Sequence, residues 1–169
     1  MSLVSVTAVF NSSVAFAETP SLFNMRVGMS KTEARDAHPE LTVFPSDPEG
    51  TDENYALGDI RFSIKAKFTD DGLQEVCGTF YESGFSTVVD ALKEKYGPGD
   101  TTKSVLQNRM GAQFDQLGII WSSPDAVLTI IRYFGGSLEK SRVCLLSGKL
   151  LDSVGDKAKK AKEELKKGL

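Results

Sequence analysis

The stretch RFSIKAKFTDDGLQEVCGTFY, residues 61–81, decides the fold. In its first half apolar residues alternate with basic or polar ones, which predicts a strand with one buried and one exposed face. Residues 69–72, Thr-Asp-Asp-Gly, are typical of a tight turn, and residues 73–81 then return as a second strand. The stretch therefore predicts an antiparallel hairpin. Its inward-facing residues are Phe62, Ile64, Ala66 and Phe68.

Two helices are expected, one before and one after this hairpin. Ser30 and Glu33 form a capping box that starts a helix over residues 31–37, and the pair His38-Pro39 ends it. A second helix is expected to begin at a cap of Ser83 or Ser86 and to end before the Gly-Pro-Gly at residues 97–99. Between the first helix and the hairpin, residues 39–59 carry six acids and no base. This acidic segment is expected to be an exposed loop, with a short strand near 41–44.

Three more strands are expected at residues 112–122, 126–134 and 141–148. The predicted order is α-β-β-α-β-β-β, an α+β fold with an antiparallel sheet of about five strands and two helices packed on one face, plus a C-terminal helix. Helix followed by hairpin occurs twice, at 31–81 and 84–134, but the sequence identity between them does not establish a duplication.

The composition excludes several classes of protein. The chain has 169 residues, a formal net charge of −3 and a pI near 5.3, without a basic stripe, so we expect no nucleic-acid partner. One histidine, His38, and two cysteines leave no set of residues at the spacing of a hydrolase triad or a zinc site. We therefore expect no catalytic residues, no metal, no cofactor and no enzyme activity. Carboxylates such as Asp90, Asp115 and Asp125 lack the spacing of a paired acid and base.

The N-terminal segment is interpreted as a leader. Residues 3–10 are apolar, and Ala15 and Ala17 fit the small-residue pattern of a signal-peptidase site. Residues 1–17 are thus expected to be a truncated signal peptide, because no basic residue precedes the apolar run. The alternative is a strand or helix that packs on the core. With a leader, residues 18–149 form a single exported domain.

Residues 150–169 are expected to form a basic amphipathic helical tail. Its apolar positions follow a spacing of three and four residues, and two of them are alanines, so the apolar stripe is narrow. The tail either docks on its own domain, pairs with a second copy or an acidic partner to give a homo-oligomer, or lies on a membrane surface. No other apolar run approaches the length of a membrane-spanning helix, so stable membrane insertion is not expected.

The two cysteines fit either of two interpretations. Cys77 lies in the second predicted strand and Cys144 in the last one. In an oxidising compartment such a pair can form a disulfide. The alternative is two separate buried cysteines, because free cysteine is commonly an interior residue.

Four segments carry a resemblance to small secreted bacterial domains. They are VGMSKTEA at 27–34, the Phe-containing strand at 61–68, Asp71-Gly72-Leu73, and LKEKYGPG at 92–99. Together they resemble the BamE (SmpA/OmlA)-like domains and the β-lactamase inhibitory protein fold, over residues 23–148. The resemblance implies a bacterial protein, periplasmic or secreted, that binds other proteins. A BamE-like lipoprotein would carry a cysteine at its processed N-terminus, whereas Glu18 stands there, so we expect no lipid anchor.

The sequence thus favours an exported, non-catalytic binding or adaptor domain that recognises a protein partner. The candidate surfaces are the outward face of the sheet, the acidic segment and the basic tail. The candidate contact residues are Arg61, Lys65, Lys67, Tyr81 and Tyr133. The alternative is a carrier of a small molecule or lipid, with a pocket between sheet and helices near Phe114, Trp121 and Phe134.

Overall fold

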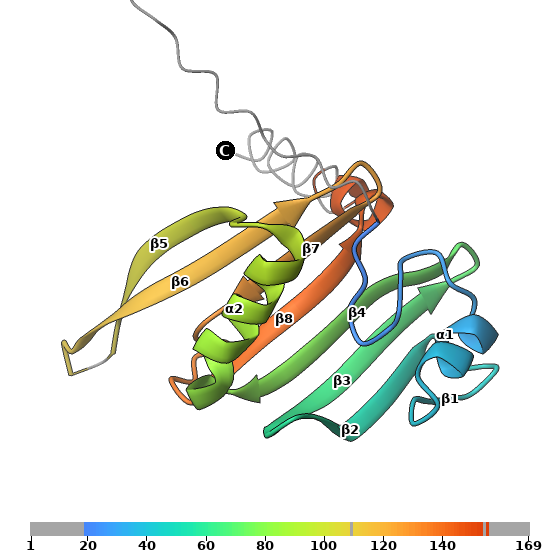
Figure 1. The fold of residues 1–169 in the computed structure, drawn as a ribbon, viewed down its shortest axis with the longest axis horizontal. Helices are drawn as coiled ribbons and strands as arrows, with labels where there is room; N and C mark the ends of the chain where they lie inside the picture. The colour runs from blue at the N-terminus through green and yellow to red at the C-terminus, as the bar shows by residue number, and fades with distance from the viewer. Residues whose placement is uncertain (1–18, 109, 154, 156–169) are drawn as a thin grey trace, which may run out of the picture.

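The computed structural model of the chain describes residues 19–108, 110–153 and 155. They form one eight-stranded antiparallel sheet, with helix α2 lying across one face (Figure 1). The elements follow in the order α1 (Lys31–Ala37), β1 (Thr42–Val43), β2 (Glu49–Leu57), β3 (Ile60–Thr69), β4 (Gly72–Tyr81), the 3-10 helix η1 (Glu82–Gly84), α2 (Phe85–Tyr96), β5 (Asp100–Gln107), β6 (Gln113–Ser122), β7 (Ala126–Ile131) and β8 (Lys140–Ser147).

The sheet is built from two similar halves that meet at β4 and β8. Its strand order is β1-β2-β3-β4-β8-β7-β6-β5, so each half runs outward from the centre in descending chain order. In each half a helix precedes four strands, with α1 before β1–β4 and α2 before β5–β8. Connections of two to eight residues join the strands within a half, so consecutive strands pair antiparallel, and the central pair β4–β8 is antiparallel as well.

The predicted five-stranded α+β fold is wrong, because the sheet has eight strands and the protein is mostly β. The short strand expected near 41–44 is present as β1, but the rest of the acidic segment, predicted as a loop, contains β2, and β5 had no predicted counterpart. Both missed long strands have polar sequences, EGTDENYAL in β2 and DTTKSVLQ in β5. β5 lies at the edge of the sheet and is exposed along its whole length. Because neither of its faces is buried, its sequence lacks the alternation of apolar and polar residues that identifies a strand.

The helix boundaries follow local chemistry. At α1 the capping box is present: the Ser30 N–H donates to the Glu33 carboxylate at 2.8 Å, and the Glu33 N–H donates to the Ser30 hydroxyl at 3.3 Å. α2 differs from the prediction, since its N-cap is Gly84 and no side chain caps it. Its C-cap is Gly97, with φ of 81°, a backbone conformation that glycine adopts without steric cost.

The hydrophobic core lies on the face of the sheet that α2 covers. Phe85, Val89 and Leu92 of α2 pack in the same cluster as the inward residues of the central strands. Trp121 is 1% exposed, and its indole N–H donates to the carbonyl of Gly97 at 2.8 Å. Within the described residues, the helices are too short or too polar to cross a membrane.

Candidate functional site

The face of the sheet opposite α2 is one candidate site, and we call it the open face. Residues that pair directly across neighbouring antiparallel strands point to the same side. One such row crosses five strands: Lys65, Cys77, Cys144, Thr129 and Ile120. The helices pack with the opposite set of side chains, including Ile64 and Val143. Neither α1 nor α2 therefore packs on the open face. The helical residues 148–153, after β8, border it at one end, where Leu150 and Ser153 line a hollow together with Lys67 and Glu75.

Three of the predicted contact residues stand together on this face. Arg61, Lys65 and Lys67 alternate along β3 and are all exposed. Glu75, opposite Lys67 on β4, pairs with it at 3.3 Å and with Arg142 of β8 at 3.2 Å. The β3 side of the open face therefore holds three cations with three acids around them: Glu75, Glu49 opposite Lys67 on β2, and Glu53, which accepts a hydrogen bond from the Ser63 hydroxyl.

The structure brings Tyr81 to Arg61 but leaves Tyr133 elsewhere. Arg61 and Tyr81 line one shallow hollow of about 340 Å³, together with Lys140. The Tyr81 side chain is highly exposed, at 67%. Tyr133 lies in the loop after β7, where its ring contacts Phe114 edge-on at a centroid distance of 6.4 Å. The predicted set thus divides between two places on the sheet.

Tyr133 belongs to a cluster of cations and aromatic rings at the ends of β7 and β8. The Arg132 guanidinium lies 5.0 Å from its ring centroid, and that of Arg142 lies 4.5 Å from the ring of Phe134. Arg132 donates to Glu82 at 2.6 Å, and this hydrogen bond raises the pKa of Arg132. Both guanidinium groups are thereby held against rings, which fixes their orientation.

The apolar part of the open face was missed by the sequence reasoning. It consists of Ile120, Val127, Ile131 and Leu146. Ile131 is 37% exposed and the other three are half-buried. The signal was present in the β7 sequence AVLTII, which is apolar on both faces. Such a run is typical of a strand that is covered on both sides. Here α2 covers only one.

The disulfide Cys77–Cys144 joins β4 to β8 at the centre of the open face. The two residues are direct cross-strand partners with Cα atoms 4.1 Å apart, and 67 positions separate them in the sequence. The bond links the two halves of the sheet where they meet, since β4 belongs to one half and β8 to the other. It therefore braces the surface on which the basic and apolar parts of the open face meet.

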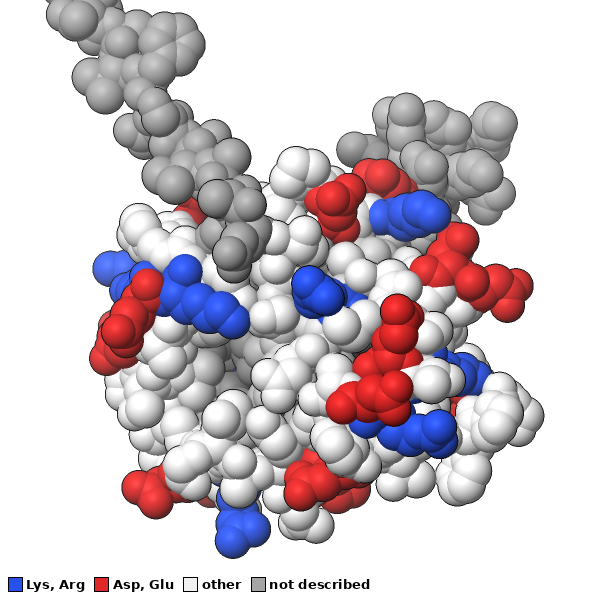
Figure 2. Space-filling model, turned by 45° about the vertical axis from the view of Figure 1, so that its right-hand side comes forward, with Lys and Arg blue, Asp and Glu red and all other residues white. Residues whose placement is uncertain are grey.

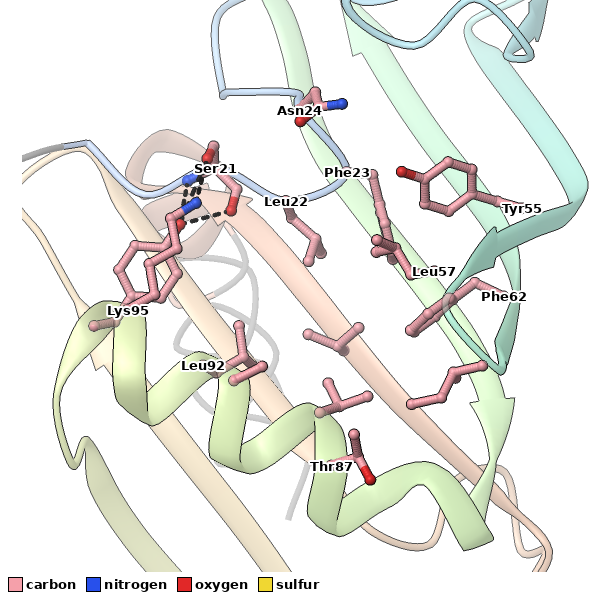
Figure 3. A pocket seen from close by; sticks show the side chains of 15 residues that line it. Ser21, Leu22, Phe23, Asn24, Tyr55, Leu57, Phe62, Thr87, Leu92 and Lys95 are labelled. Carbon is pink, nitrogen blue, oxygen red and sulfur yellow. Dashed lines mark hydrogen bonds between the residues drawn. The ribbon is translucent and has the colours of Figure 1, made fainter.

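The second candidate site is an apolar groove on the α2 side of the sheet (Figure 3). Its volume is about 410 Å³, within the range of small-molecule sites. One wall is the flank of α2 with Thr87, Val88 and Ala91, and the other comes from residues 21–24 and from β2 and β3. Its principal apolar side chains are Leu22, Phe23, Leu57, Ile60, Phe62 and Leu92. Figure 2 shows charged side chains gathered at the left, at the right and at the lower edge of this side, with a mostly uncharged area between them that has a basic group near its middle.

Polar groups gather at one end of the groove. Lys95 donates to the Ser21 hydroxyl at 3.3 Å, and its ammonium lies 5.0 Å from the ring centroid of Tyr96. The Tyr96 hydroxyl donates to the Ser21 carbonyl at 2.8 Å and accepts from the Ser21 N–H at 3.0 Å. Burial acts to raise the pKa of Tyr96, but the hydrogen bonds with Ser21 and the charge of Lys95 outweigh it and lower that pKa. This end is therefore electropositive.

A strained turn forms the wall opposite α2. Leu22 and Met25 exchange two backbone hydrogen bonds of 2.9 Å, and the residues between them, Phe23 and Asn24, have φ of 53° and 64°. Asparagine tolerates this left-handed conformation, whereas phenylalanine rarely adopts it. The turn directs the Phe23 ring onto β4 at Gly78. The predicted pocket near Phe114, Trp121 and Phe134 is not this groove, since none of the three lines it.

Two groups of side chains among the described residues have ligand atoms close enough to hold a metal ion. One contains Glu75 and the two bonded cysteines, which have no thiolate to offer. The other contains His38, Glu40 and Asp52, and here His38 Nε2 is bonded to the Asp52 carboxylate at 2.9 Å. Because that pair is 2% and 9% exposed, it serves as a buried contact between the end of α1 and β2.

The three carboxylates considered for catalysis lie on separate elements. Asp90 is on α2, Asp115 is on β6, and Asp125 is in the turn before β7. The predicted leader, residues 1–17, and most of the basic tail lie outside the described residues. No protein-family model, curated protein or solved structure matches the chain.

Proposed function

We propose that the chain is an exported, non-catalytic binding domain whose open face recognises a protein partner. The observation that carries the proposal is the apolar part of that face, Ile120, Val127, Ile131 and Leu146, which α2 does not cover. Strands that are apolar on both faces ordinarily have both faces buried. A protein partner would supply the missing cover.

The surroundings of the apolar part define the chemistry of the partner. Its direct cross-strand neighbours are charged: Glu75 stands opposite Leu146, Asp100 opposite Ile120, and Arg142 opposite Ile131. Lys65 and Lys67 lie one strand further out, on β3, and Tyr81 stands at the end of β4 with most of its ring exposed. Interfaces place apolar and aromatic residues at their centre and charged residues at their rim. The partner that fits is therefore a protein with an apolar patch bordered by charged side chains of both signs, and with acidic groups where it reaches the lysines of β3.

The rigidity of the face supports the same role. Its residues lie on strands, and the disulfide Cys77–Cys144 connects the two halves at the centre. A preorganised surface loses little conformational entropy when a partner binds. Disulfides also persist in oxidising compartments, which agrees with the export expected from residues 1–17. The resemblance to BamE-like and β-lactamase inhibitory protein-like domains, which bind proteins, agrees with this proposal.

The test is site-specific cross-linking with a photoreactive phenylalanine analogue in a periplasmic extract. The analogue is placed at Ile131 on the open face and, as a control, at Asp90 on the exposed side of α2. The proposal expects one protein adduct at position 131 and none at position 90, and mass spectrometry of the adduct identifies the partner. Equal adducts at both positions, or none at 131, would contradict it.

Variants of the open face measure the affinity of that partner. Tyr81→Ala is expected to weaken binding about tenfold, because truncation of an interfacial tyrosine commonly costs more than about 1 kcal/mol. Lys65→Glu is expected to slow association with an acidic rim. Lys93→Glu, on α2, provides the same charge change on the other side and should leave the affinity unaltered.

The groove beneath α2 favours a second function, the binding of a small apolar ligand. A volume of about 410 Å³ with a mainly apolar lining and polar groups at one end is typical of a ligand site. Titration of the full chain with an apolar fluorescent probe tests this function. Ala91→Trp, which fills the groove from α2, is expected to abolish the response, and probe binding that survives the substitution would exclude the groove.

A further inference from the structure

We infer that the groove binds a medium-chain fatty acid, with the acyl chain along its apolar lining and the carboxylate beside Lys95. The inference rests on the second proposed function, a ligand-binding groove, and names the class of ligand. It is independent of the open face, since the two sites lie on opposite sides of the sheet.

The apolar lining fits a hydrocarbon chain. Val143, at the centre of the sheet, is fully buried, and Phe23 and Phe62 contact each other edge-on at a centroid distance of 5.1 Å. Leu57, at the β2 side, is 52% exposed, and Ala91 on α2 is also exposed. An acyl chain lying between Leu57 and Ala91 would remove both side chains from water, and the burial of apolar surface is the principal driving force for such binding.

The charge of the groove is asymmetric. Among the described residues that line it, Lys95 is the one charged side chain, and no carboxylate in the described part of the chain lies within ion-pair distance of it. Lys95 and Ser21 stand together at one end, while Thr87 lies toward the other end of α2 (Figure 3). A ligand with one anionic end and a long apolar body matches this arrangement. A cationic amphiphile would place its charge against Lys95 or leave it without a partner.

Three ligands with the same twelve-carbon chain test the assignment, in calorimetric titrations of the full chain below the concentration at which micelles form. Dodecanoate is expected to bind about two- to fivefold more tightly than dodecanol, because an exposed ion pair adds a modest increment of affinity. Dodecyltrimethylammonium is expected to bind more weakly than both. The preference for the carboxylate should decrease as salt is added. From decanoate to dodecanoate, affinity should increase about fourfold for each methylene that becomes buried.

Two pairs of variants locate the ligand. Lys95→Met removes the cation but keeps an apolar stem, and it should equalise the affinities for dodecanoate and dodecanol. Lys93→Met makes the same change at an α2 position outside the groove and should preserve the preference. Ala91→Trp should abolish binding of all three ligands. Ser86→Trp adds the same bulk on α2 outside the lining and should leave binding intact.

The outcomes separate this inference from the function on which it rests. If dodecanoate and dodecanol bind equally, or if Lys95→Met keeps the preference, the fatty-acid assignment is wrong and the groove remains a site for uncharged apolar ligands. If no twelve-carbon ligand binds, or if Ala91→Trp leaves binding unchanged while circular dichroism shows a native fold, both the assignment and the ligand-binding function are wrong.

Discussion

The ring of Phe23 occupies the space that a side chain at Gly78 would need. A Cβ atom built at residue 78 would lie 2.8 Å from Cε2 of Phe23 and 3.0 Å from Cδ1 of Phe62. Gly78 stands on β4 between Ile64 and Val143, at the middle of the sheet. The absence of a side chain there allows the turn at residues 22–25 to reach the sheet and to form one wall of the groove.

Gly78→Ala is therefore expected to destabilise the protein by about 1–3 kcal/mol, the usual cost of overpacking a core. The measurement is urea unfolding of the full chain followed by circular dichroism. A double-mutant cycle with Phe23→Leu provides the control, because a shorter side chain at position 23 should reduce the cost of the added methyl group. An unchanged cost in the Phe23→Leu background would show that the methyl group meets something else.

Reduction of Cys77–Cys144 is expected to lower the free energy of unfolding by roughly 4 kcal/mol, the chain-entropy value for a loop of this length. The loop is long because 67 positions separate the two cysteines. Urea unfolding with and without reductant measures the difference, and intact mass should increase by two hydrogen atoms on reduction. The double variant Cys77→Ala with Cys144→Ala should be insensitive to reductant. A wild-type midpoint that reductant does not move would contradict the expectation.

The central part of the fold could be predicted because its residues alternate between two different environments. β3 buries Phe62, Ile64, Ala66 and Phe68, and the helix over 31–37 has a complete capping box. The outer strands could not be found in this way. β5 is exposed on both faces, so its side chains show no period of two, and its pairing with β6 rests on backbone hydrogen bonds.

The candidate sites were predicted less well than the strands. The alternation of apolar and polar residues along β3 predicts that Arg61, Lys65 and Lys67 lie on its outward face, and they lie there in the structure. Both the apolar part of the open face and the groove depend on which strands become neighbours across the chain. β4 pairs with β8, more than sixty positions away, and the 22–25 turn packs on β4 through an unusual backbone conformation at Phe23. No local pattern contains that information.

The capping box of α1 is expected to contribute to stability in a pH-dependent way. Hydrogen bonds from the Ser30 backbone N–H and then from the Ser30 hydroxyl lower the pKa of Glu33 below its ordinary value of 4.5. A carboxyl group whose folded pKa is depressed stabilises the fold above its unfolded pKa, and this contribution is lost as pH falls through the folded pKa. Glu33→Gln should therefore be less stable than the wild type at neutral pH and equal to it at pH values below both pKa values. Urea midpoints of the wild type and of Glu33→Gln, measured across this pH range, test the expectation, with Glu94→Gln on α2 as the control. A stability difference between Glu33→Gln and the wild type that grows on acidification would contradict it.

Trp121→Phe is expected to destabilise the protein by about 1–3 kcal/mol, because the substitution removes the indole donor from the Gly97 carbonyl and leaves a void in the core. The hydrogen bond is 2.8 Å long and joins β6 to the residue that ends α2. Since α2 forms one wall of the groove, loosening of its end should also weaken dodecanoate binding.

Urea unfolding followed by circular dichroism measures the loss of stability, and calorimetric titration measures the loss of dodecanoate affinity. Tyr81→Ala is the matched control, since that aromatic ring is 67% exposed and its loss should change stability by no more than about 0.5 kcal/mol. A Trp121→Phe protein as stable as Tyr81→Ala would show that the indole hydrogen bond does not hold α2 to the sheet.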